Sequence, residues 1–310
     1  MPGRGWLYGI AGALMYVISV AFLHFRFEQP LSDFLPVLLI VGLGFSVLSW
    51  MILRNLPFAG EKPFFPREGL LLLFLIVWIV LYITWGGDWI NRALPSAWTT
   101  EKKMNEWVTL CRKLLVFVVV PMFLYRAGGF ELKDFGFRKP AILFFERRSL
   151  MLMIVLLMAI LLFQYYLSNG GRAFRNGGFD LRELLIGLPL CLAWLFIEAG
   201  LVEEFFFRAV LQSRLSALTR SPTGGLVLSA LVFGLCHAPG LFLRGAESEG
   251  ASEPLPFLFW CAYTIAFMSV AGLFFGIVWQ RTKNIFIVMF LHAIFDLLPN
   301  AGEFIRTWRG

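Results

Sequence analysis

Charged residues are scarce in this chain of 310 residues. Asp, Glu, Lys and Arg make up 15% of it, whereas 59% of the residues are hydrophobic. Soluble domains average about 25% charged and about 45–50% apolar residues. A single globular core cannot bury so large an apolar surplus, so the remaining apolar side chains must face lipid. The composition excludes a soluble domain and predicts an integral membrane protein.

Cysteine is also rare, and no CxxC pair occurs. The four cysteines all lie in or beside apolar segments: Cys111, Cys191, Cys236 and Cys261. This placement is typical of small core residues and indicates neither a disulfide framework nor a zinc ribbon. The sequence also lacks an internal repeat and any basic stretch that alternates with aromatic residues. The net charge of +7 therefore indicates basic loops that face anionic lipid, and no nucleic-acid partner is expected.

Long apolar runs supply the membrane-spanning helices, because a bilayer core about 30 Å thick needs about 20 apolar residues of helix. Eight segments come close to that length: 6–25, 34–56, 69–86, 148–168, 183–207, 224–243, 255–280 and 284–300. A ninth segment, 107–125, carries Arg112 and Lys113 near its start, and we expect these side chains to snorkel to the lipid headgroups. The first segment has no small-residue cleavage site, which indicates a retained span. The predicted fold class is an all-α integral membrane protein with eight or nine transmembrane helices.

The loops between these spans differ in charge. Lys and Arg gather in the loops 126–148, 211–223 and 281–284, whereas the loop 244–253 holds three glutamates and a single arginine. By the positive-inside rule, the N-terminus and the three basic loops are cytoplasmic. We expect a multi-pass protein of the bacterial inner membrane or an equivalent membrane.

Ionisable residues inside membrane helices cost about 2.5–3.5 kcal/mol each on insertion scales, so they usually face a cavity or a partner. Three late spans concentrate them. The chain has three histidines, and two of them belong to this set: Glu198, Glu203, Glu204 and Arg208 in the sixth span, His237 in the seventh, and His292 and Asp296 in the ninth. A rise of about 1.5 Å per residue puts most of these groups at a similar depth near the membrane centre, with His237 deeper than the others. We expect Glu198 to bind another helix and leave it outside the site.

Helix geometry distinguishes the two adjacent glutamates. Glu204 and Arg208 are four residues apart, so they share a helix face, and we expect a structural ion pair between them. Glu203 points about 100° away from that pair. The sequence therefore favours Glu203 as a general base. His292 and Asp296 have the same spacing of four, and Asp296 is expected to orient the imidazole.

Three motifs lie on separate spans, in this order: Glu203-Glu204-x-x-x-Arg208, Phe233-x-x-x-His237 and His292-x-x-x-Asp296. Together they resemble the signature of the CAAX prenyl protease and bacteriocin-processing family of intramembrane endopeptidases, over about 180–300. We expect three parts: N-terminal transmembrane helices without a family match (1–127), a cytoplasmic amphipathic linker (128–147) and a catalytic transmembrane core that resembles this family (148–310).

The resemblance also implies roles for these residues. Glu203 and His237 would activate a water molecule, and His292 and Asp296 would stabilise the oxyanion, with Glu204 and Arg208 in support. Asp296 departs from the asparagine of the prenyl-protein members. An ionised carboxylate cannot donate to an oxyanion, so Asp296 must either be protonated or orient His292 and leave it to donate. The active site is expected to face the cytoplasm, with no cofactor, and to act on a membrane-associated protein or peptide: a prenylated C-terminus, a bacteriocin leader or a sorting helix.

Two other functions are compatible with the same residues. A zinc peptidase would use His237, His292 and a glutamate as ligands, but the compact HExxH spacing on one helix is absent. A transporter or non-catalytic membrane chaperone would use the carboxylates as a proton relay or as counter-ions. Against it, no inverted repeat is visible and the polar residues are confined to three C-terminal spans. Replacement of Glu203 by glutamine distinguishes these classes, because only a peptidase should lose cleavage.

Overall fold

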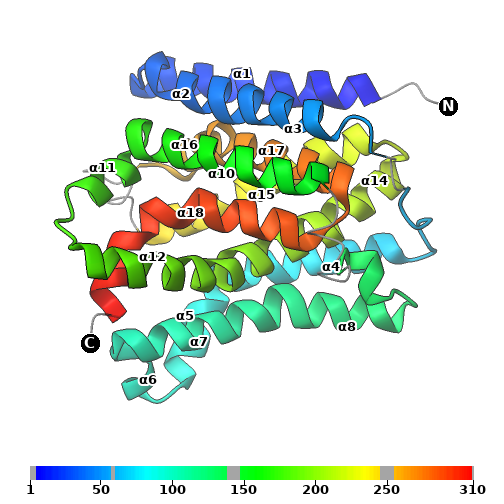
Figure 1. Cartoon of the computed structure of the whole chain (residues 1–310). Helices are drawn as coiled ribbons and strands as arrows, with labels where there is room; N and C mark the ends of the chain where they lie inside the picture. Colours follow the sequence, from blue (N-terminus) through cyan, green and yellow to red (C-terminus); the bar gives the residue numbers. More distant parts are fainter. Residues whose placement is uncertain (1–4, 57–59, 138–146, 245–254, 309–310) are drawn as a thin grey trace. The chain divides into compact units, whose positions relative to one another are not determined.

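The structure is a computed structural model that describes residues 5–56, 60–137, 147–244 and 255–308. Within these ranges the chain forms helices and turns and no strand, which confirms the all-α prediction (Figure 1). Nine of the described helical segments are long and apolar enough to cross a membrane: Gly5–Phe27, Leu31–Leu53, Glu68–Ala93, Lys102–Ala127, Leu150–Leu167, Leu181–Thr219, Pro222–Leu243, Phe257–Thr282 and Ile285–Trp308. The segment predicted at 107–125 is therefore one of these candidate spans.

The sixth helical segment is longer than predicted. The sequence places it at 183–207, whereas the helix runs without a break over Leu181–Thr219. It comprises α12 (Leu181–Leu195), a π-helical turn (Phe196–Leu201), α13 (Val202–Glu204), a second π-helical turn (Phe205–Gln212) and α14 (Ser213–Thr219). Its start is fixed by a capping box, in which Asp180 accepts from the backbone N–H of Glu183 and Glu183 accepts from that of Asp180.

The predicted loop at 211–223 is therefore mostly helix, and Arg214 is not a loop residue. Its side chain is buried in α14 and donates to both carboxylate oxygens of Glu68, at the start of α4 (Glu68–Leu81). It also donates to the backbone carbonyls of Lys62 and Pro63. A hydropathy criterion places Arg214 in a loop, since a charged residue is costly inside a span. The sequence does not reveal that the distant carboxylate of Glu68 neutralises it.

The snorkelling predicted for Arg112 and Lys113 is also wrong. Both residues lie on α7 (Lys102–Leu114). Lys113 forms an ion pair with Glu198, and Arg112 donates to Asn91 Oδ1 at 2.6 Å. Protein groups therefore hold both cations, and Glu198 binds another helix as expected.

The chain divides into two compact units, each built from early and late segments. The first comprises Met1–Trp50, Pro57–Gly87 and Val210–Arg281, and the second comprises Met51–Leu56, Asp88–Ala209 and Thr282–Gly310. In the first unit, α1 (Gly5–Phe27) packs against α15 (Pro222–Arg244) and α16 (Phe257–Ala266). This unit also contains α2 (Leu31–Pro36), most of α3 (Ser46–Leu53), α4, α14 and most of α17 (Met268–Thr282). The predicted division at 127 and 148 stays a prediction.

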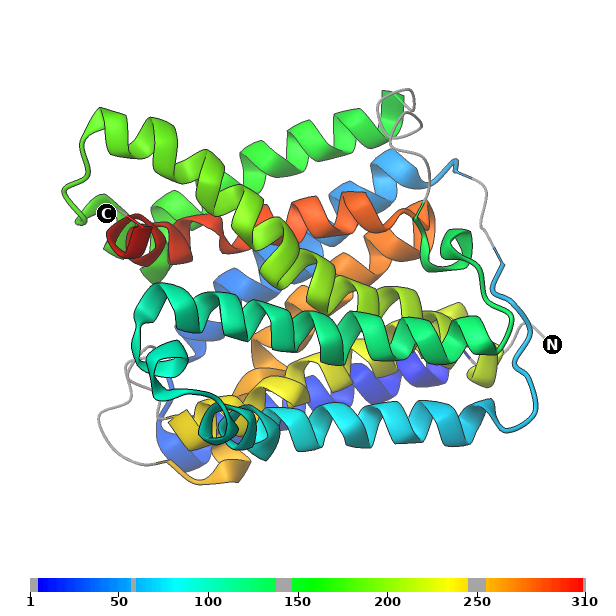
Figure 2. The same ribbon diagram turned by 90° about the horizontal axis from the view of Figure 1, so that it is seen from below.

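In the second unit, α18 (Ile285–Trp308) is the central helix. It packs against α10 (Arg147–Leu167), α11 (Asn169–Arg175) and α12, and the long sixth helix passes obliquely beside it (Figures 1 and 2). A glycine permits this close approach, because a Cβ added to Gly200 would lie 2.7 Å from the carbonyl oxygen of Met289. Gly200 precedes Glu203 by three residues and Met289 precedes His292 by three. The contact therefore brings the two site-bearing helix segments together.

The linker predicted at 128–147 is described as far as residue 137. A short 3-10 turn, Leu132–Phe135, carries Phe135 into a buried position against Phe205, with 5.2 Å between the ring centroids. The backbone carbonyl of Gly136 accepts from Ile285 N–H at the start of α18. Residues 138–146, and nearly all of the predicted acidic loop at 244–253, lie outside the described residues.

Candidate active site

The Glu204–Arg208 ion pair lies at the centre of the candidate site. Arg208 Nε donates to Glu204 Oε2 at 2.9 Å, and neither side chain is exposed. This confirms the contact that the i,i+4 spacing predicts. Glu204 ends α13 and Arg208 lies in the π-helical turn that follows. Such turns are rare and frequently occur at functional sites.

Glu204 has a second partner, His292 on α18. Its Oε1 atom lies 2.6 Å from Nδ1 of the imidazole. An ionised carboxylate can only accept, so the Glu204 carboxylate of this ion pair accepts in both contacts and His292 donates its Nδ1–H. The sequence predicts only a structural role for the Glu204–Arg208 pair. The structure connects this pair to the imidazole and fixes the orientation of the ring.

The other ring nitrogen of His292 faces two carboxylates. Nε2 lies 3.3 Å from Asp296 Oδ2 and 3.9 Å from Glu203 Oε2. These carboxylates are partly accessible, with 31% and 20% of their side chains exposed, whereas His292 is 6% exposed. The imidazole therefore lies between a buried ion pair on one side and two accessible carboxylates on the other. Glu203 points away from Arg208, as the helix geometry predicts.

His237 belongs to the first unit, on α15, so its geometry is described there alone. Its Nδ1 lies 2.7 Å from the carbonyl oxygen of Phe233, one turn earlier, and the two rings are 4.9 Å apart between centroids. A carbonyl can only accept, so Nδ1 carries a proton. In the neutral ring Nε2 is then the basic nitrogen.

The part of the chain that the structure describes contains no evident metal-binding site. No group of three His, Cys, Asp or Glu side chains there is placed to hold a metal ion. In the second unit, the ring nitrogens of His292 contact carboxylates from two helices. The second unit therefore presents an imidazole–carboxylate site.

The fold and this site are those of a multi-pass helical protein with a cluster of acid–base side chains between its helices. Comparison with known families is more specific. Residues 185–298 match the family model Rce1-like, described as type II CAAX prenyl endopeptidase Rce1-like. This segment covers less than half of the chain and includes all six predicted site residues. Its similarity to CAAX-type endopeptidases supports a membrane-embedded peptide hydrolase. No curated protein and no solved structure matches the chain.

Proposed function

We propose that the protein cleaves a peptide bond of a membrane-associated substrate with a water molecule activated by Glu203 and His237. The observation that supports this mechanism is the position of His292. Its Nδ1 contacts Glu204 of the buried ion pair, and its Nε2 points toward the accessible carboxylates of Glu203 and Asp296. Such an arrangement holds a catalytic ring rigidly while leaving its reactive side open to water.

Glu203 is the general base in this proposal. Its side chain is partly exposed, so a water molecule can reach the carboxylate from outside the helix pair. General-base catalysis needs the base within hydrogen-bond distance of the proton that it removes. His237 assists through Nε2, since Nδ1 donates to Phe233. Glu203 and His237 can activate the same water molecule only if they lie close together in the working enzyme. We include this closeness in the proposal.

His292 stabilises the oxyanion. Its Nδ1–H donates to Glu204, so Nε2 can donate only when the ring is the imidazolium. Three carboxylates lie within 3.9 Å of its ring nitrogens, so both N–H groups of an imidazolium would have an acceptor. Asp296 then accepts Nε2–H in the resting enzyme and releases it to the oxyanion that forms from the scissile carbonyl. In this mechanism Asp296 orients His292 and does not itself donate.

The substrate enters from the cytoplasmic side in this proposal. Arg214 and Lys283 no longer support that orientation, because both are buried, but Arg220 and Arg281 remain near the ends of the sixth and eighth helical segments. The candidate substrates are a prenylated C-terminus, a bacteriocin leader and a C-terminal sorting helix. The name of the matching family favours the first of these.

The test compares membranes of cells that express the wild type with membranes that contain Glu203→Gln. New protein N-termini are labelled chemically and identified by mass spectrometry. Peptides released by the wild type should decrease by at least about 10²-fold in Glu203→Gln, the usual contribution of a general base. Glu131→Gln, an exposed glutamate paired with Lys133, is the matched control and should cleave normally. If Glu203→Gln yields the same N-termini at the same rate, Glu203 is not the base, and a transporter or chaperone becomes the better assignment.

A further inference from the structure

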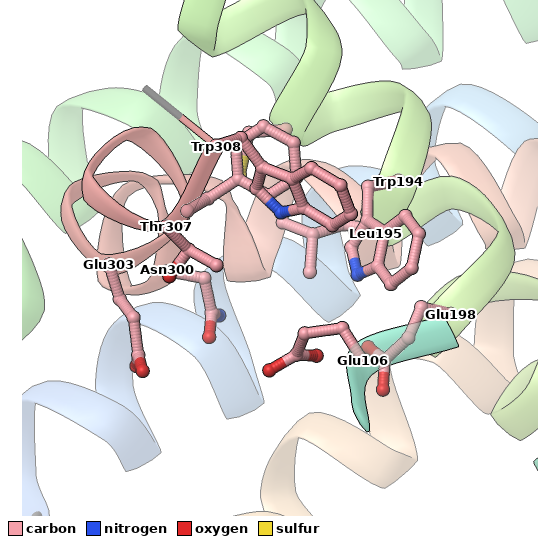
Figure 3. Close-up of a pocket in the computed structure, with 10 residues that line it drawn as sticks. Glu106, Trp194, Leu195, Glu198, Asn300, Glu303, Thr307 and Trp308 are labelled. Atoms are coloured by element: carbon pink, nitrogen blue, oxygen red, sulfur yellow. The ribbon is translucent and has the colours of Figure 1, made fainter. Parts of the chain in front are cut away.

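A pocket of about 160 Å³ lies inside the second unit, beside α7, α12 and the C-terminal half of α18. Two indole rings form one wall, those of Trp194 and Trp308, whose centroids are 5.6 Å apart. Three carboxylates also line it, those of Glu106, Glu198 and Glu303, and Figure 3 shows them on the side away from the indoles. Aromatic faces and carboxylates are thus combined in one cavity.

The carboxylates around this pocket outnumber the lysines. Glu198 is paired with Lys113, and Glu303 is paired with Lys102 at 3.0 Å. Glu106 lies within electrostatic range of both other carboxylates and of both lysines. Among the described residues, no hydrogen bond or ion pair joins Glu106 to another side chain. Three carboxylates therefore face two lysines, and a further cation would relieve the repulsion between them.

The pocket suits an organic cation better than a metal ion. A hard metal ion needs several oxygen ligands arranged around it, and the described residues offer no such group. Indole faces attract ammonium and guanidinium groups through their π-systems. They also pack well against the apolar stem of a lysine or arginine side chain. Thr307 also lines the pocket, and its hydroxyl is buried without a hydrogen-bond partner among the described residues.

One polar face of α18 connects this pocket to the candidate active site. Residues spaced three or four apart occupy that face, within an arc of about 80°: His292, Asp296, Asn300, Glu303 and Thr307. Asn300 Nδ2 donates to the carbonyl oxygen of Asp296 at 2.8 Å. Cys191, which lines the pocket, lies within electrostatic range of Asp296. From His292 to Glu303 the helix rises about 16 Å.

We infer that this pocket binds a lysine or arginine side chain of the peptide substrate, about five residues from the bond that is cleaved. The spacing follows from the distance along α18, since an extended peptide advances about 3.3 Å per residue. The inference rests on the proposed peptidase function. A lipid ammonium headgroup would share the chemistry, but the polar face that leads to His292 favours the substrate. Glu106, Trp194 and Trp308 are then specificity-determining residues.

The test measures binding without cleavage. The full chain carrying Glu203→Gln is purified in maltoside micelles, whose sugar headgroups carry no charge. Two fluorescein-labelled dodecapeptides, apolar apart from one central lysine or norleucine, are titrated, and binding is followed by fluorescence anisotropy. The lysine peptide should bind about tenfold more tightly, the gain expected for a desolvated cation over indole rings. Adding Glu106→Gln should remove this preference, whereas Glu131→Gln should preserve it. Thermal unfolding of each variant checks that it is folded.

Equal binding of the two peptides, or no measurable binding of either, overturns the inference. A lysine preference that survives in Glu106→Gln overturns it as well. If phosphatidylethanolamine abolishes the preference and phosphatidylglycerol does not, the pocket is a lipid headgroup site and the substrate assignment is wrong. Because the binding variant need not cleave, this result is independent of the N-terminus experiment that tests the peptidase itself.

Discussion

The buried Glu204–Arg208 pair allows stability and catalysis to be separated by mutation. Neither side chain is exposed, and the pair is joined at 2.9 Å. Arg208→Met leaves the Glu204 carboxylate buried without the guanidinium. Glu204→Leu leaves the Arg208 guanidinium buried without the carboxylate. Removing one partner of a buried pair costs about 3–5 kcal/mol. Each single variant should therefore show a lower free energy of unfolding by about that amount.

The double variant Glu204→Leu/Arg208→Met should behave differently. Replacing both members of a buried ion pair by apolar residues of similar volume is often neutral or stabilising. Most of the lost stability should therefore return, which gives a large coupling energy in the double-mutant cycle. Thermal or denaturant unfolding of the purified protein in micelles, for the wild type and all three variants, measures this coupling.

Activity should not return with stability. His292 loses its acceptor for Nδ1–H when Glu204 is replaced, and that contact is 2.6 Å long in the structure. A misplaced catalytic group can cost about 10²-fold in rate. The double variant should accordingly be stable yet at least about 10²-fold slower in releasing the N-termini identified with the wild type. A double variant that regains both stability and cleavage would show that the pair is only structural, and the proposed orientation of His292 would be refuted.

Four further predictions concern Asp296, Gly200, the need for a metal and the membrane topology. Asp296→Asn should retain activity within about tenfold, because an amide can both hold the ring and donate to an oxyanion; a much larger loss, measured by N-terminus release, would mean that the carboxylate is needed. Gly200→Val should abolish folding or cleavage, because its Cβ would meet the backbone of Met289; a stable, active variant would argue against this helix contact. Cleavage should survive exhaustive chelation, with elemental analysis as the check; stoichiometric zinc whose removal stops cleavage would favour the zinc peptidase. In a Cys-free background, Thr223→Cys should react with an impermeant thiol reagent only from the cytoplasmic side and Asn176→Cys only from the other; the reverse pattern would invert the predicted topology.

Local spacing predicted those features that depend on one helix alone. The Glu204–Arg208 and His292–Asp296 contacts follow from i,i+4 geometry, and the structure has both. The direction of Glu203, away from Arg208, also follows from that geometry. These predictions succeed because an α-helix fixes the angle between neighbouring residues, whatever surrounds it.

Contacts between distant segments were not predictable in this way. The bond from His292 to Glu204 joins residues 88 apart, and the Arg214–Glu68 pair joins residues 146 apart. A hydropathy criterion counts each isolated charge as a cost. It therefore predicts that the sixth span ends before Arg214 and that Lys113 reaches the lipid headgroups. Packing of helices decides which charges meet, and a single sequence contains no direct record of that packing. The carboxylate pocket around Glu106 was missed for the same reason.

The two π-helical turns of the sixth helix allow its length to change without moving the site. Each such turn holds more residues than an α-helical turn, and many π-bulges correspond to one additional residue within an α-helix. Deleting one residue from Phe196–Leu201 would let that stretch rewind as α-helix, and the later residues would keep nearly the same directions. Deleting one residue from α12 would instead rotate every later residue by about 100°, so Glu204 would take the direction of Glu203, and Glu203 that of Val202. A homologous chain with a deletion in α12 would need a compensating change elsewhere to remain active, whereas insertions and deletions in the π-helical turns are expected to be tolerated.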